Sequence, residues 1–343
     1  RCQAAGITFI GPAPEVLELF GDKAAARALA ERCGVPLVAG INQAVSLEQA
    51  QAFCTEHGAV MLKALAGGGG RGMRAVFEPA ALAEAYARCQ SEAQAAFGNG
   101  ALYIEQLVSD ARHIEVQVLG DGSGAVSHLW ERDCSLQRRN QKLVEIAPSP
   151  DLDSDVRDAM IAAALHLAAE VKYCGIGTFE FLLDAAQPGR FYFMEANPRV
   201  QVEHTVSEQV TGIDLLHTQL KLVAGQSLAA LGLLQPPAVQ GFAVQLRINL
   251  ETLHADGSIP EGIEAQTALT LDRIEATLKS QGLGLDDVVS VCAYLTETSD
   301  FAAFNRVYAT RFNEPRPVRT TVHCGLMLPG ARVELTVVAA ERP

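Results

Sequence analysis

The sequence of 343 residues is poor in aromatic side chains, which make up 6% of it, and it has no excess of positive charge. Its 27 Lys and Arg residues stand against 40 Asp and Glu residues, which leaves a formal net charge of −13. A protein that binds nucleic acid or acidic lipid through its overall charge needs the opposite balance, so we expect neither as a partner. No uninterrupted apolar run reaches the ~20 residues that span a bilayer, which argues against a membrane protein.

Targeting signals and metal-binding cysteine motifs are also missing. The first residues contain neither an initiator methionine nor an apolar leader, so secretion is not expected and the chain looks as if it begins within a domain. The 8 cysteines are scattered, with no C-x-x-C pair and no Cys/His spacing typical of zinc. We therefore expect reduced, mostly buried thiols and a cytoplasmic location.

Hydrophobic residues make up 49% of a chain that is long enough for about two domains, and their spacing predicts an α/β protein. The periods of strands and helices alternate along the chain. Strands are predicted over 6–10, 60–65, 74–77, 102–105, 114–119, 126–131 (followed by a polar, basic segment over 132–142), 177–183, 191–195 and 242–250, and helices from residue 14 and over 24–33, 79–96, 154–171 and 214–224. Beyond residue 262 a compact module is predicted, with helices at 271–278 and 300–312 and strands at 289–295, 318–324 and 333–339.

A glycine-rich hairpin is the first feature that points to a ligand. Gly67–Gly70 and Gly72 lie between two predicted strands, and each costs about 1 kcal/mol relative to alanine. Such a loop supplies unhindered amide N–H groups that close over phosphates, and Lys63 adds a cation just before it. The spacing fits neither a Walker A motif nor a G-x-G-x-x-G helix start. The alternative is a flexible surface hairpin.

Two predicted strands carry polar side chains that suit a divalent ion. Glu195 and Asn197 are two residues apart, so they share one face of an extended strand, and Glu180 interrupts an otherwise apolar strand. Two carboxylates and an amide oxygen match the ligand preferences of Mg²⁺ or Mn²⁺. The alternative is a structural, salt-bridged pair.

The segment Arg-Val-Gln-Val-Glu-His follows directly. A period of two places Arg199, Gln201 and Glu203 on one face beside the expected metal ligands. The arginine fork can bind a small oxyanion, and the carboxylate next to it can act as a general base. Lys142 and Arg247 are further cations that we expect to converge there.

Taken together, these segments resemble the ATP-grasp enzymes and, within them, biotin carboxylase, the unit also found in acyl-CoA and pyruvate carboxylases. The resemblance runs from residue 1 to about 255, and the runs Glu-Arg-Asp-Cys-Ser and Gln-Val-Glu-His are close to diagnostic of this subfamily. It is based on the segments Phe9–Pro12, Gly21–Lys23, Lys63, Gly67–Met73, Arg112–Gln117, Glu131–Arg139, Gly177–Phe181, Glu195–Asn197, Arg199–His204 and Arg247–Asn249. It implies an ATP-grasp fold with a glycine-rich lid subdomain.

The resemblance also implies a role for each candidate residue. ATP would be bound through its phosphates by Lys23, Lys63, Gly69 and Gly70, through adenine by Glu105, Gln106, Leu107 and Val108, and on the ribose side by His113 and Gln137. The divalent ions would be bound by Glu180, Glu195 and Asn197. Bicarbonate would be held by Lys142, Arg199, Gln201 and Val202, with Glu203 removing its proton and Arg247 stabilising the biotin enolate.

The implied reaction is the ATP-dependent carboxylation of biotin. Bicarbonate attacks the γ-phosphate to give carboxyphosphate, which delivers CO₂ to biotin, so ATP, biotin and Mg²⁺ or Mn²⁺ (two ions) are the implied cofactors. The implied partners are a biotin carrier protein or domain and a carboxyltransferase subunit, and a homo-oligomer is an open alternative to a monomer. Two departures from the family are Asn140, where it has His, and Leu250–Thr252, where it has Ala-Glu-Asp.

From about residue 263 the chain instead resembles the C-terminal part of the Rid family of imine deaminases. The similar segments are Glu264–Thr267, Leu285–Val289, Asp300–Asn305 and Arg319–Val322. In that family Arg319 would bind a substrate carboxylate and Glu334 would position a water. The first strands of that fold are missing, so we expect its sheet to lack partner strands and the chain to associate or aggregate.

The predicted organisation has four parts. Residues 1–22 are a remnant of the biotin carboxylase N-terminal domain, residues 23–235 an ATP-grasp domain with its lid at about 35–107, residues 236–262 the start of a truncated C-terminal domain, and residues 263–343 a partial Rid-like (chorismate-mutase-like) α+β module. The alternative functions are a Rid-type 2-imino acid deaminase, an oligomerisation module at the C-terminus, and a non-catalytic nucleotide-binding fragment.

Overall fold

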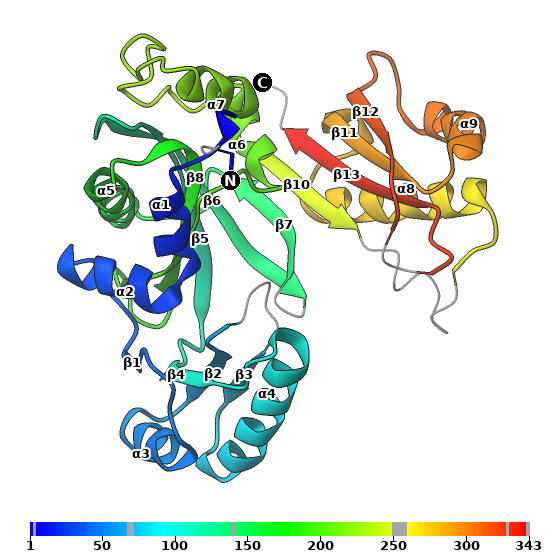
Figure 1. Ribbon diagram of the computed structural model, residues 1–343. Coiled ribbons are helices and arrows are strands. Elements are labelled where there is room, and N and C mark those ends of the chain that lie inside the picture. The colour runs from blue at the N-terminus through cyan, green and yellow to red at the C-terminus, as the bar shows by residue number, and fades with distance from the viewer. Residues whose placement is uncertain (3–4, 67–71, 139–140, 249–258, 327–328, 341–343) are drawn as a thin grey trace.

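The computed structural model describes residues 1–2, 5–66, 72–138, 141–248, 259–326 and 329–340, with the backbone alone at 247–248. The strands of these residues form one sheet of four strands and one of nine (Figure 1). None of the helices in this part of the chain combines the length and the apolar character that crossing a membrane requires.

The small sheet belongs to residues 40–106, which we call the lid, and its strand order is β1-β4-β2-β3. Leu62 and Ile104 on its central strands are fully buried, and they share a core with Phe53 and Cys89 on the two helices. The elements are β1 (Gly40–Ile41), α3 (Leu47–His57), β2 (Val60–Ala64), β3 (Met73–Val76), a 3₁₀ turn (Pro79–Ala81), α4 (Leu82–Phe97) and β4 (Leu102–Gln106).

The large sheet has the order β12-β11-β13-β10-β7-β6-β5-β8-β9. In β5 and β8, alternate residues such as Val116 and Phe179 are fully buried in a core shared with α1, α2 and α5. The residues between them, among them Glu115 and Glu180, must therefore point to the opposite face of the sheet. The elements of this region are α1 (Pro14–Gly21), α2 (Lys23–Arg32), β5 (Ala111–Asp121), β6 (Val126–Arg138), β7 (Gln141–Ala147), α5 (Ser154–Glu170), β8 (Cys174–Asp184) and β9 (Phe191–Asn197).

The C-terminal module shares both a sheet and a core with the preceding part of the chain. Strand β13 pairs antiparallel with β10, which pairs on its other side with β7 (Figure 1). Val244 and Leu246 of β10 are buried in one core with Ile274 and Leu335 of the module. The remaining elements are α6 (His204–Thr211), α7 (Leu215–Val223), β10 (Ala243–Ile248), α8 (Ile263–Ser280), a 3₁₀ turn (Leu285–Asp287), β11 (Val288–Leu295), a 3₁₀ turn (Thr298–Asp300), α9 (Phe301–Arg311), β12 (Val318–His323) and β13 (Val333–Ala340).

The expectation that the sheet of the module lacks partner strands is therefore wrong for β13, which has a partner strand from the preceding part of the chain. Strand β10 occupies the place next to β13, so the backbone groups of β13 are paired on both sides. Strand β12 remains at the edge of the sheet, where the side chain of Val318 is exposed. Exposed apolar residues also lie near the N-terminus, at Ile7, Phe9 and Ile10.

Most of the predicted helices and strands are confirmed, and three differ. Residues 6–10 do not form a strand, because no described strand lies beside them to pair with their backbone. Residues 132–138 continue β6 rather than forming a separate polar segment, because their backbone pairs with β5 and β7. Residues 199–203 form a turn that leads into the unpredicted helix α6, and not the extended segment that their alternation suggested.

The shared core predicts that the C-terminal module and the large sheet unfold together. We expect Leu246→Ala to lower the free energy of unfolding by about 2–5 kcal/mol, because it leaves a cavity in that core. Urea denaturation followed by circular dichroism measures the change. The matched control is Leu220→Ala at an exposed position of α7, with an expected change within about 0.5 kcal/mol. Two separate unfolding transitions of the unmodified protein would contradict the shared core.

A buried histidine predicts how stability varies in acid. His128 of β6 accepts a hydrogen bond at Nδ1 from the backbone N–H of Trp130 (3.2 Å), which requires a neutral ring. Burial lowers the pKa of His128 to about 4, with Asp158 opposing the shift. An unfolded histidine titrates near about 6.5. Below that pH the unfolded chain takes up a proton that the folded chain does not, so stability falls as the pH drops from 6.5 toward 4.

His128→Gln removes this titration while keeping an acceptor for the backbone N–H. Between pH 7 and pH 4, we expect the unmodified protein to lose up to about 3 kcal/mol of stability relative to the variant. Urea midpoints at several pH values measure the difference. His166→Gln, at an exposed position, is the control and should run parallel to the unmodified protein. A pH-independent difference for His128→Gln would show that the buried ring does not titrate in this way.

Candidate active site

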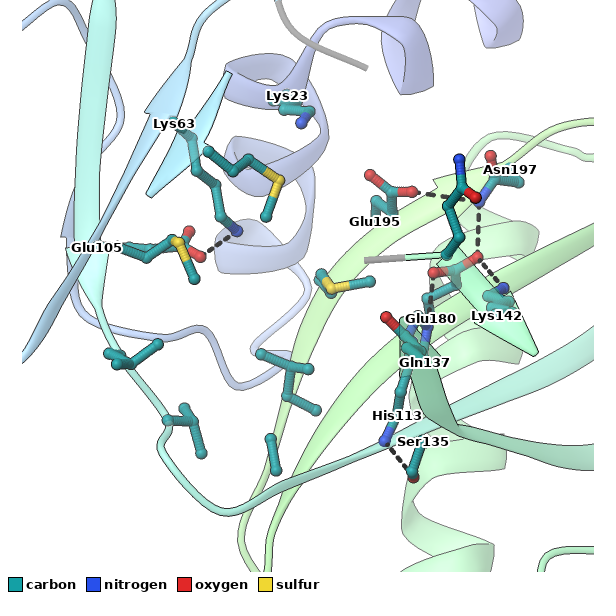
Figure 2. A pocket seen from close by; sticks show the side chains of 18 of the residues that line it. Lys23, Lys63, Glu105, His113, Ser135, Gln137, Lys142, Glu180, Glu195 and Asn197 are labelled. Carbon is teal, nitrogen blue, oxygen red and sulfur yellow. Dashed lines mark hydrogen bonds and ion pairs between the residues drawn. The ribbon is translucent and has the colours of Figure 1, made fainter. Parts of the chain in front are cut away.

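A cleft of about 640 Å³ is lined by residues of the lid, of α2 and of the polar face of the large sheet (Figure 2). A pocket of this size suits a nucleotide-sized ligand. Almost every described candidate residue lines it: Lys23, Lys63, Glu105, Gln106, Leu107, Val108, His113, Gln137, Lys142, Glu180, Glu195, Asn197, Arg199, Gln201, Val202 and Glu203.

The strand register places charged residues in one row, which runs from Glu195 and Glu180 at the cleft to the fully buried Glu115 and Arg132. Arg132 on β6 is paired with Glu115 on β5, Glu115 with Glu180 on β8, and Glu180 with Glu195 on β9. Like charges on directly opposite residues of neighbouring strands destabilise a sheet. The three carboxylates therefore need cations close by.

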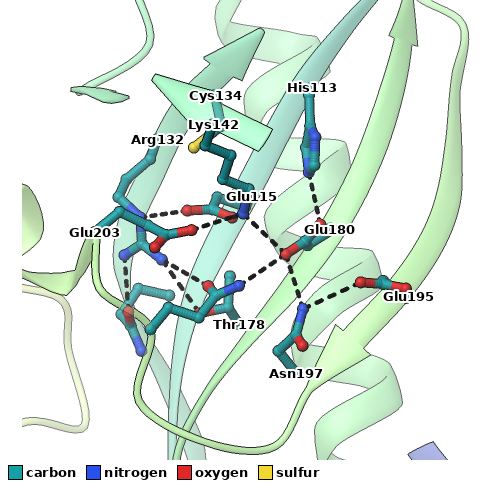
Figure 3. A network of polar contacts seen from close by, with 12 residues as sticks. His113, Glu115, Arg132, Cys134, Lys142, Thr178, Glu180, Glu195, Asn197 and Glu203 are labelled. Carbon is teal, nitrogen blue, oxygen red and sulfur yellow. Dashed lines mark hydrogen bonds and ion pairs between the residues drawn. The ribbon is translucent and has the colours of Figure 1, made fainter. Parts of the chain in front are cut away.

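Arg132 supplies one of these cations from a fully buried position (Figure 3). Its Nε donates to Glu115 Oε1 (2.6 Å), and its four other N–H groups have acceptors on Gln117 (2.8 Å), Ser207 (2.9 Å), Thr178 (3.2 Å) and Gln201 (3.3 Å). All five donors of the guanidinium thus have an acceptor. This network fixes both the Glu115 carboxylate and the side chain of Gln201 at the cleft.

Lys142 on β7 supplies the second cation. Its Nζ donates to Glu115 Oε2 (2.5 Å), to Glu203 Oε1 (2.7 Å) and to Glu180 Oε1 (3.1 Å), which uses all three of its N–H groups (Figure 3). Burial alone would lower the pKa of Lys142, but the surrounding carboxylates raise it well above its usual range. Burial would raise the pKa of Glu115, but Arg132 and Lys142 hold it below its ordinary value. The ammonium group therefore stays charged and neutralises the carboxylates around it.

His113 connects Glu180 to Gln137 in the cleft. Nδ1 of His113 lies 2.8 Å from the amide nitrogen of Gln137, and Nε2 lies 2.7 Å from Glu180 Oε2. Burial would lower the pKa of His113, but Glu180 raises it above its ordinary value. The hydroxyl of Ser135 accepts a hydrogen bond from the backbone N–H of His113 (2.9 Å) and donates one to Asp133 Oδ1 (2.5 Å). Burial would raise the pKa of Glu180, but His113, Lys142 and Gln201 hold it well below its usual range. Glu180 is therefore ionised at neutral pH.

The predicted metal ligands lie together and fit a divalent cation. The Nδ2 of Asn197 donates to Glu180 Oε1 (2.8 Å) and to Glu195 Oε1 (3.4 Å), so the two carboxylate oxygens converge on one point. Rotation of the amide would present its oxygen to the same point, and the resulting all-oxygen set is the kind that Mg²⁺ prefers.

Two other clusters of acidic, Cys or His groups in the described residues are close enough to share a metal. Both contain Glu115, one with His113 and Glu180 and the other with Cys134 and Glu203. Glu115, which both clusters share, already pairs with Arg132 and Lys142, so two cations neutralise it. Burial raises the pKa of Cys134 well above its usual value, so this thiol stays protonated and is a poor ligand.

The phosphate-binding candidates lie across the cleft from this sheet. Lys23 is the first residue of α2, whose N-terminus is capped by Asp22 through hydrogen bonds from Ala24 (2.8 Å) and Ala25 (3.0 Å). Burial lowers the pKa of Lys23, Glu195 raises it, and Lys63 lowers it further. Lys63 on β2 is buried and forms an ion pair with Glu105 on β4 (Figure 2).

The turn before α6 presents the candidates for bicarbonate. Gln201 is buried and donates to Glu180 Oε1 (2.8 Å), whereas Arg199 and Val202 are exposed at the cleft. Arg199 donates to Asn197 Oδ1 (3.2 Å), which joins this turn to the expected metal site. Glu203 precedes α6 and accepts a hydrogen bond from Lys142 (2.7 Å), so the candidate base and a candidate bicarbonate ligand lie next to each other.

Five further candidate residues are either outside the described residues or in another part of the molecule. Gly69 and Gly70 lie outside the described residues, as does the side chain of Arg247. Arg319 lies in the C-terminal module, where its guanidinium stacks on Tyr308 at 4.5 Å from the ring centroid. Glu334 is in the same module, in register with Tyr294.

Arg319 and Glu334 lie on opposite faces of the C-terminal sheet. Arg319 is in register with the buried Val291 and faces helix α9, whereas Glu334 is in register with Tyr294, which points to the other face. Arg319 and Glu334 of one chain therefore cannot contact the same ligand. Their geometry does not support the roles that the Rid resemblance implies for them.

Sequence reasoning missed two central members of the site, Arg132 and Glu115. Both were inside segments that carried the resemblance, but neither was given a role. The available signal was the alternation in β5, where His113, Glu115 and Gln117 interrupt a run of apolar residues at every second position. Three polar groups on one buried face require partners, and Arg132 on the neighbouring strand supplies one.

Comparison with known proteins shows the family of this chain. Residues 22–231 match the family described as "Carbamoyl-phosphate synthase L chain, ATP binding domain". The pyruvate carboxylase of Schizosaccharomyces pombe is 51% identical over 254 residues, which are 73% of this chain and 21% of that protein. The mitochondrial pyruvate carboxylase of Rattus norvegicus is 50% identical over 253 residues, again 73% of this chain and 21% of that protein. The chain thus spans about a fifth of the length of these relatives.

Solved structures give the same result for the fold. A biotin carboxylase complex with β,γ-ATP from Campylobacter jejuni has a TM-score of 0.68 at 42% identity and covers 74% of this chain and 56% of that chain. The biotin carboxylase domain dimer of Hydrogenobacter thermophilus 2-oxoglutarate carboxylase, in complex with MgADP, ADP and bicarbonate, has a TM-score of 0.73 at 32% identity and covers 99% of this chain and 66% of that chain. The predicted ATP-grasp fold and the resemblance to biotin carboxylase are confirmed.

The second resemblance is confirmed as well. Residues 249–341 match the family described as "Endoribonuclease L-PSP", which agrees with a Rid-like C-terminal module. The chain therefore joins segments of two families, and the structure pairs them through β10 and β13.

The five-acceptor network predicts that Arg132 is essential for folding. We expect Arg132→Met to lower the free energy of unfolding by about 3–5 kcal/mol, because it leaves Glu115 buried beside other carboxylates without its partner. The double variant Arg132→Met/Glu115→Leu should recover part of this loss, since no stranded charge remains. Thermal and urea unfolding measure both. Arg306→Met, at an exposed position of α9, is the control, and an equally small effect at Arg132 would refute the buried network.

Proposed function

The chain belongs to the family of carbamoyl-phosphate synthase L chain ATP-binding domains, and on this premise we propose that it is an ATP-dependent ligase that carboxylates biotin with bicarbonate. The reaction is expected to pass through carboxyphosphate, with a biotin group on a carrier protein or domain as the acceptor. The observation that carries the proposal is the convergence of Lys23, Lys63, Glu195, Lys142 and Glu203 on one cleft.

The two sides of the cleft differ in charge. Lys23 and Lys63 present cations from α2 and the lid to the phosphates of ATP. The opposite side presents the oxygens of Glu180, Glu195 and Asn197, which would hold one or two Mg²⁺ or Mn²⁺ ions. When bound, these ions neutralise phosphate charge and help to orient the triphosphate.

Bicarbonate fits the region beside the expected metal site. Arg199 offers a planar fork for an oxyanion, Gln201 is held in place by Arg132 and Glu180, and Lys142 adds a charge that its neighbours keep positive. Glu203 lies within hydrogen-bonding distance of Lys142 and would accept the proton of bicarbonate as the oxygen attacks the γ-phosphate. Preorganised charges of this kind stabilise the developing phosphoryl charge of the transition state.

The named relatives also support proposals about the partners and the cellular location of this protein. Relatives named pyruvate carboxylase, together with the named 2-oxoglutarate carboxylase domain dimer, support a biotin carrier and a carboxyltransferase as partners and a homo-oligomeric state. We retain the cytoplasm as the proposed location, and cell fractionation tests it against the mitochondria named for some relatives. A Rid-type activity receives less support, because Arg319 and Glu334 face away from each other.

The test is bicarbonate-dependent hydrolysis of ATP, with stimulation by free biotin. We expect Lys63→Ala and Glu195→Ala each to lower kcat/KM on the order of 100-fold or more, since each removes a charge that acts on the transferred phosphoryl group. Phosphate release by a coupled assay measures the rate. Lys279→Ala and Glu56→Ala, at exposed positions, are the matched controls and should keep the activity of the unmodified protein. Hydrolysis that persists in both cleft variants would refute the assignment of the site.

A further inference from the structure

Two chain segments connect the lid to the rest of the molecule, and they run in close contact. The incoming segment ends in β1 and the outgoing segment begins at β4, where Gly40 is paired with Glu105 and the N–H of Gln106 donates to Ala39 O (2.8 Å). A side chain at Gly40 would place its Cβ 2.9 Å from the backbone oxygen of Ile104, so only glycine permits this approach. The lid is therefore joined to the body at one narrow crossing.

Arg27 of α2 reaches both segments of this crossing. Its Nη2 donates to the backbone oxygen of Val38 (2.7 Å) on the incoming segment, and its Nη1 lies 3.7 Å from Glu105 Oε2 on the outgoing strand. The side chain is buried, and its Nε has no hydrogen-bond acceptor among the described residues. The guanidinium of Arg27 thus has an N–H donor without an acceptor among the described residues, and the carboxylate of Glu105 lies just beyond hydrogen-bonding distance.

The same carboxylate holds Lys63. Oxygen Oε1 of Glu105 forms the close ion pair with Lys63, while Oε2 faces Arg27. All three side chains are only about 7% exposed, so none of them can rely on water to stabilise its charge. Any movement of Lys63 away from Glu105 leaves that carboxylate in need of another partner.

We propose that Arg27 is a positioning residue that takes over Glu105 when Lys63 turns to a nucleotide phosphate. Lys63 uses one of its three N–H groups for Glu105, and a phosphate that draws the ammonium group toward the cleft weakens that ion pair. The shift is favourable only if Glu105 does not remain buried and unpaired. Arg27 has the free donor, the short distance and the fixed position on α2 that this exchange needs. The inference is built on the proposed function in one respect, namely that the ligand of Lys63 is a triphosphate.

The exchange also couples phosphate binding to the position of the lid. Arg27 belongs to α2 in the body, whereas Glu105 and Lys63 belong to the lid strands β4 and β2. A shift of Glu105 toward Arg27 therefore shortens a contact between the two parts at their crossing.

Binding of ATP with magnesium, measured by isothermal titration calorimetry, tests the proposal without turnover. We expect Arg27→Gln to raise the Kd for ATP on the order of tenfold or more, because Lys63 then remains with Glu105. The kcat of bicarbonate-dependent hydrolysis at saturating ATP should stay within about threefold of the unmodified protein, since the change affects ligand binding. Arg27→Lys retains the charge and should recover part of the affinity. Arg32→Gln, at an exposed position of the same helix, is the matched control.

A double variant separates this role from a merely structural one. In a Glu105→Gln background no carboxylate can be left unpaired, so adding Arg27→Gln should change the Kd by less than about threefold. An equal loss of affinity with and without Glu105 would mean that Arg27 only supports the fold, and would overturn the inference. If Arg27→Gln does not fold, as judged by its thermal transition, the comparison is made with Arg27→Lys in both backgrounds.

The remaining outcomes distinguish this inference from the proposed function. Unchanged ATP affinity in a folded Arg27→Gln overturns the inference and leaves the proposed function intact. Absence of ATP binding by the unmodified protein overturns both. Tenfold weaker binding that disappears in the Glu105→Gln background supports both.

Discussion

The buried pair of Arg132 and Glu115 is the interaction on which the candidate site depends. The strand register sets Glu115, Glu180 and Glu195 in one row, and such a row of like charges would otherwise disrupt the sheet. Arg132 donates from all five of its N–H groups at one end, and Lys142 donates to the carboxylates from the adjoining strand. A buried ion pair adds little net stability compared with apolar residues in the same space, but the loss of one partner is costly. What the pair provides is a fixed arrangement of carboxylates at the cleft.

The cleft brings together two groups of residues with opposite charge. Lys23 and Lys63 supply cations for phosphates, whereas Glu180 and Glu195 supply anions for a divalent ion. Lys63 belongs to the lid, whereas Lys23, Glu180 and Glu195 belong to the body, and β1 and β4 lie at the crossing between these two parts. Glu105 lies at that crossing and is itself one of the residues that line the cleft. Electrostatic changes in the cleft can therefore act directly on the connection between lid and body.

The C-terminal module is joined to the preceding part of the chain through its sheet. Its sheet gains a strand from the preceding segment, because β10 pairs with β13 on one side and with β7 on the other. Leu246 and Val244 of β10 then pack in the same hydrophobic core as the buried residues of helix α8. Composition and pattern indicated two separate units here, since the resemblance changes near residue 263. Pairing between strands more than eighty positions apart in the sequence is a tertiary property, and local patterns carry no information about it.

The sequence by itself determined most of the helices and strands, because alternation and capping are local properties. The ATP-grasp fold and most of the residues at the cleft followed from the resemblance of its short motifs to biotin carboxylase. The sequence also led to a strand at residues 6–10 that does not form, since a strand needs a partner that local alternation cannot supply. Only the tertiary structure decided that Arg132 neutralises the carboxylate row, that residues 199–203 turn into α6, and that Arg319 and Glu334 point apart. Each of these depends on register and on which face of a sheet a side chain occupies, and neighbouring strands set both only after the chain has folded.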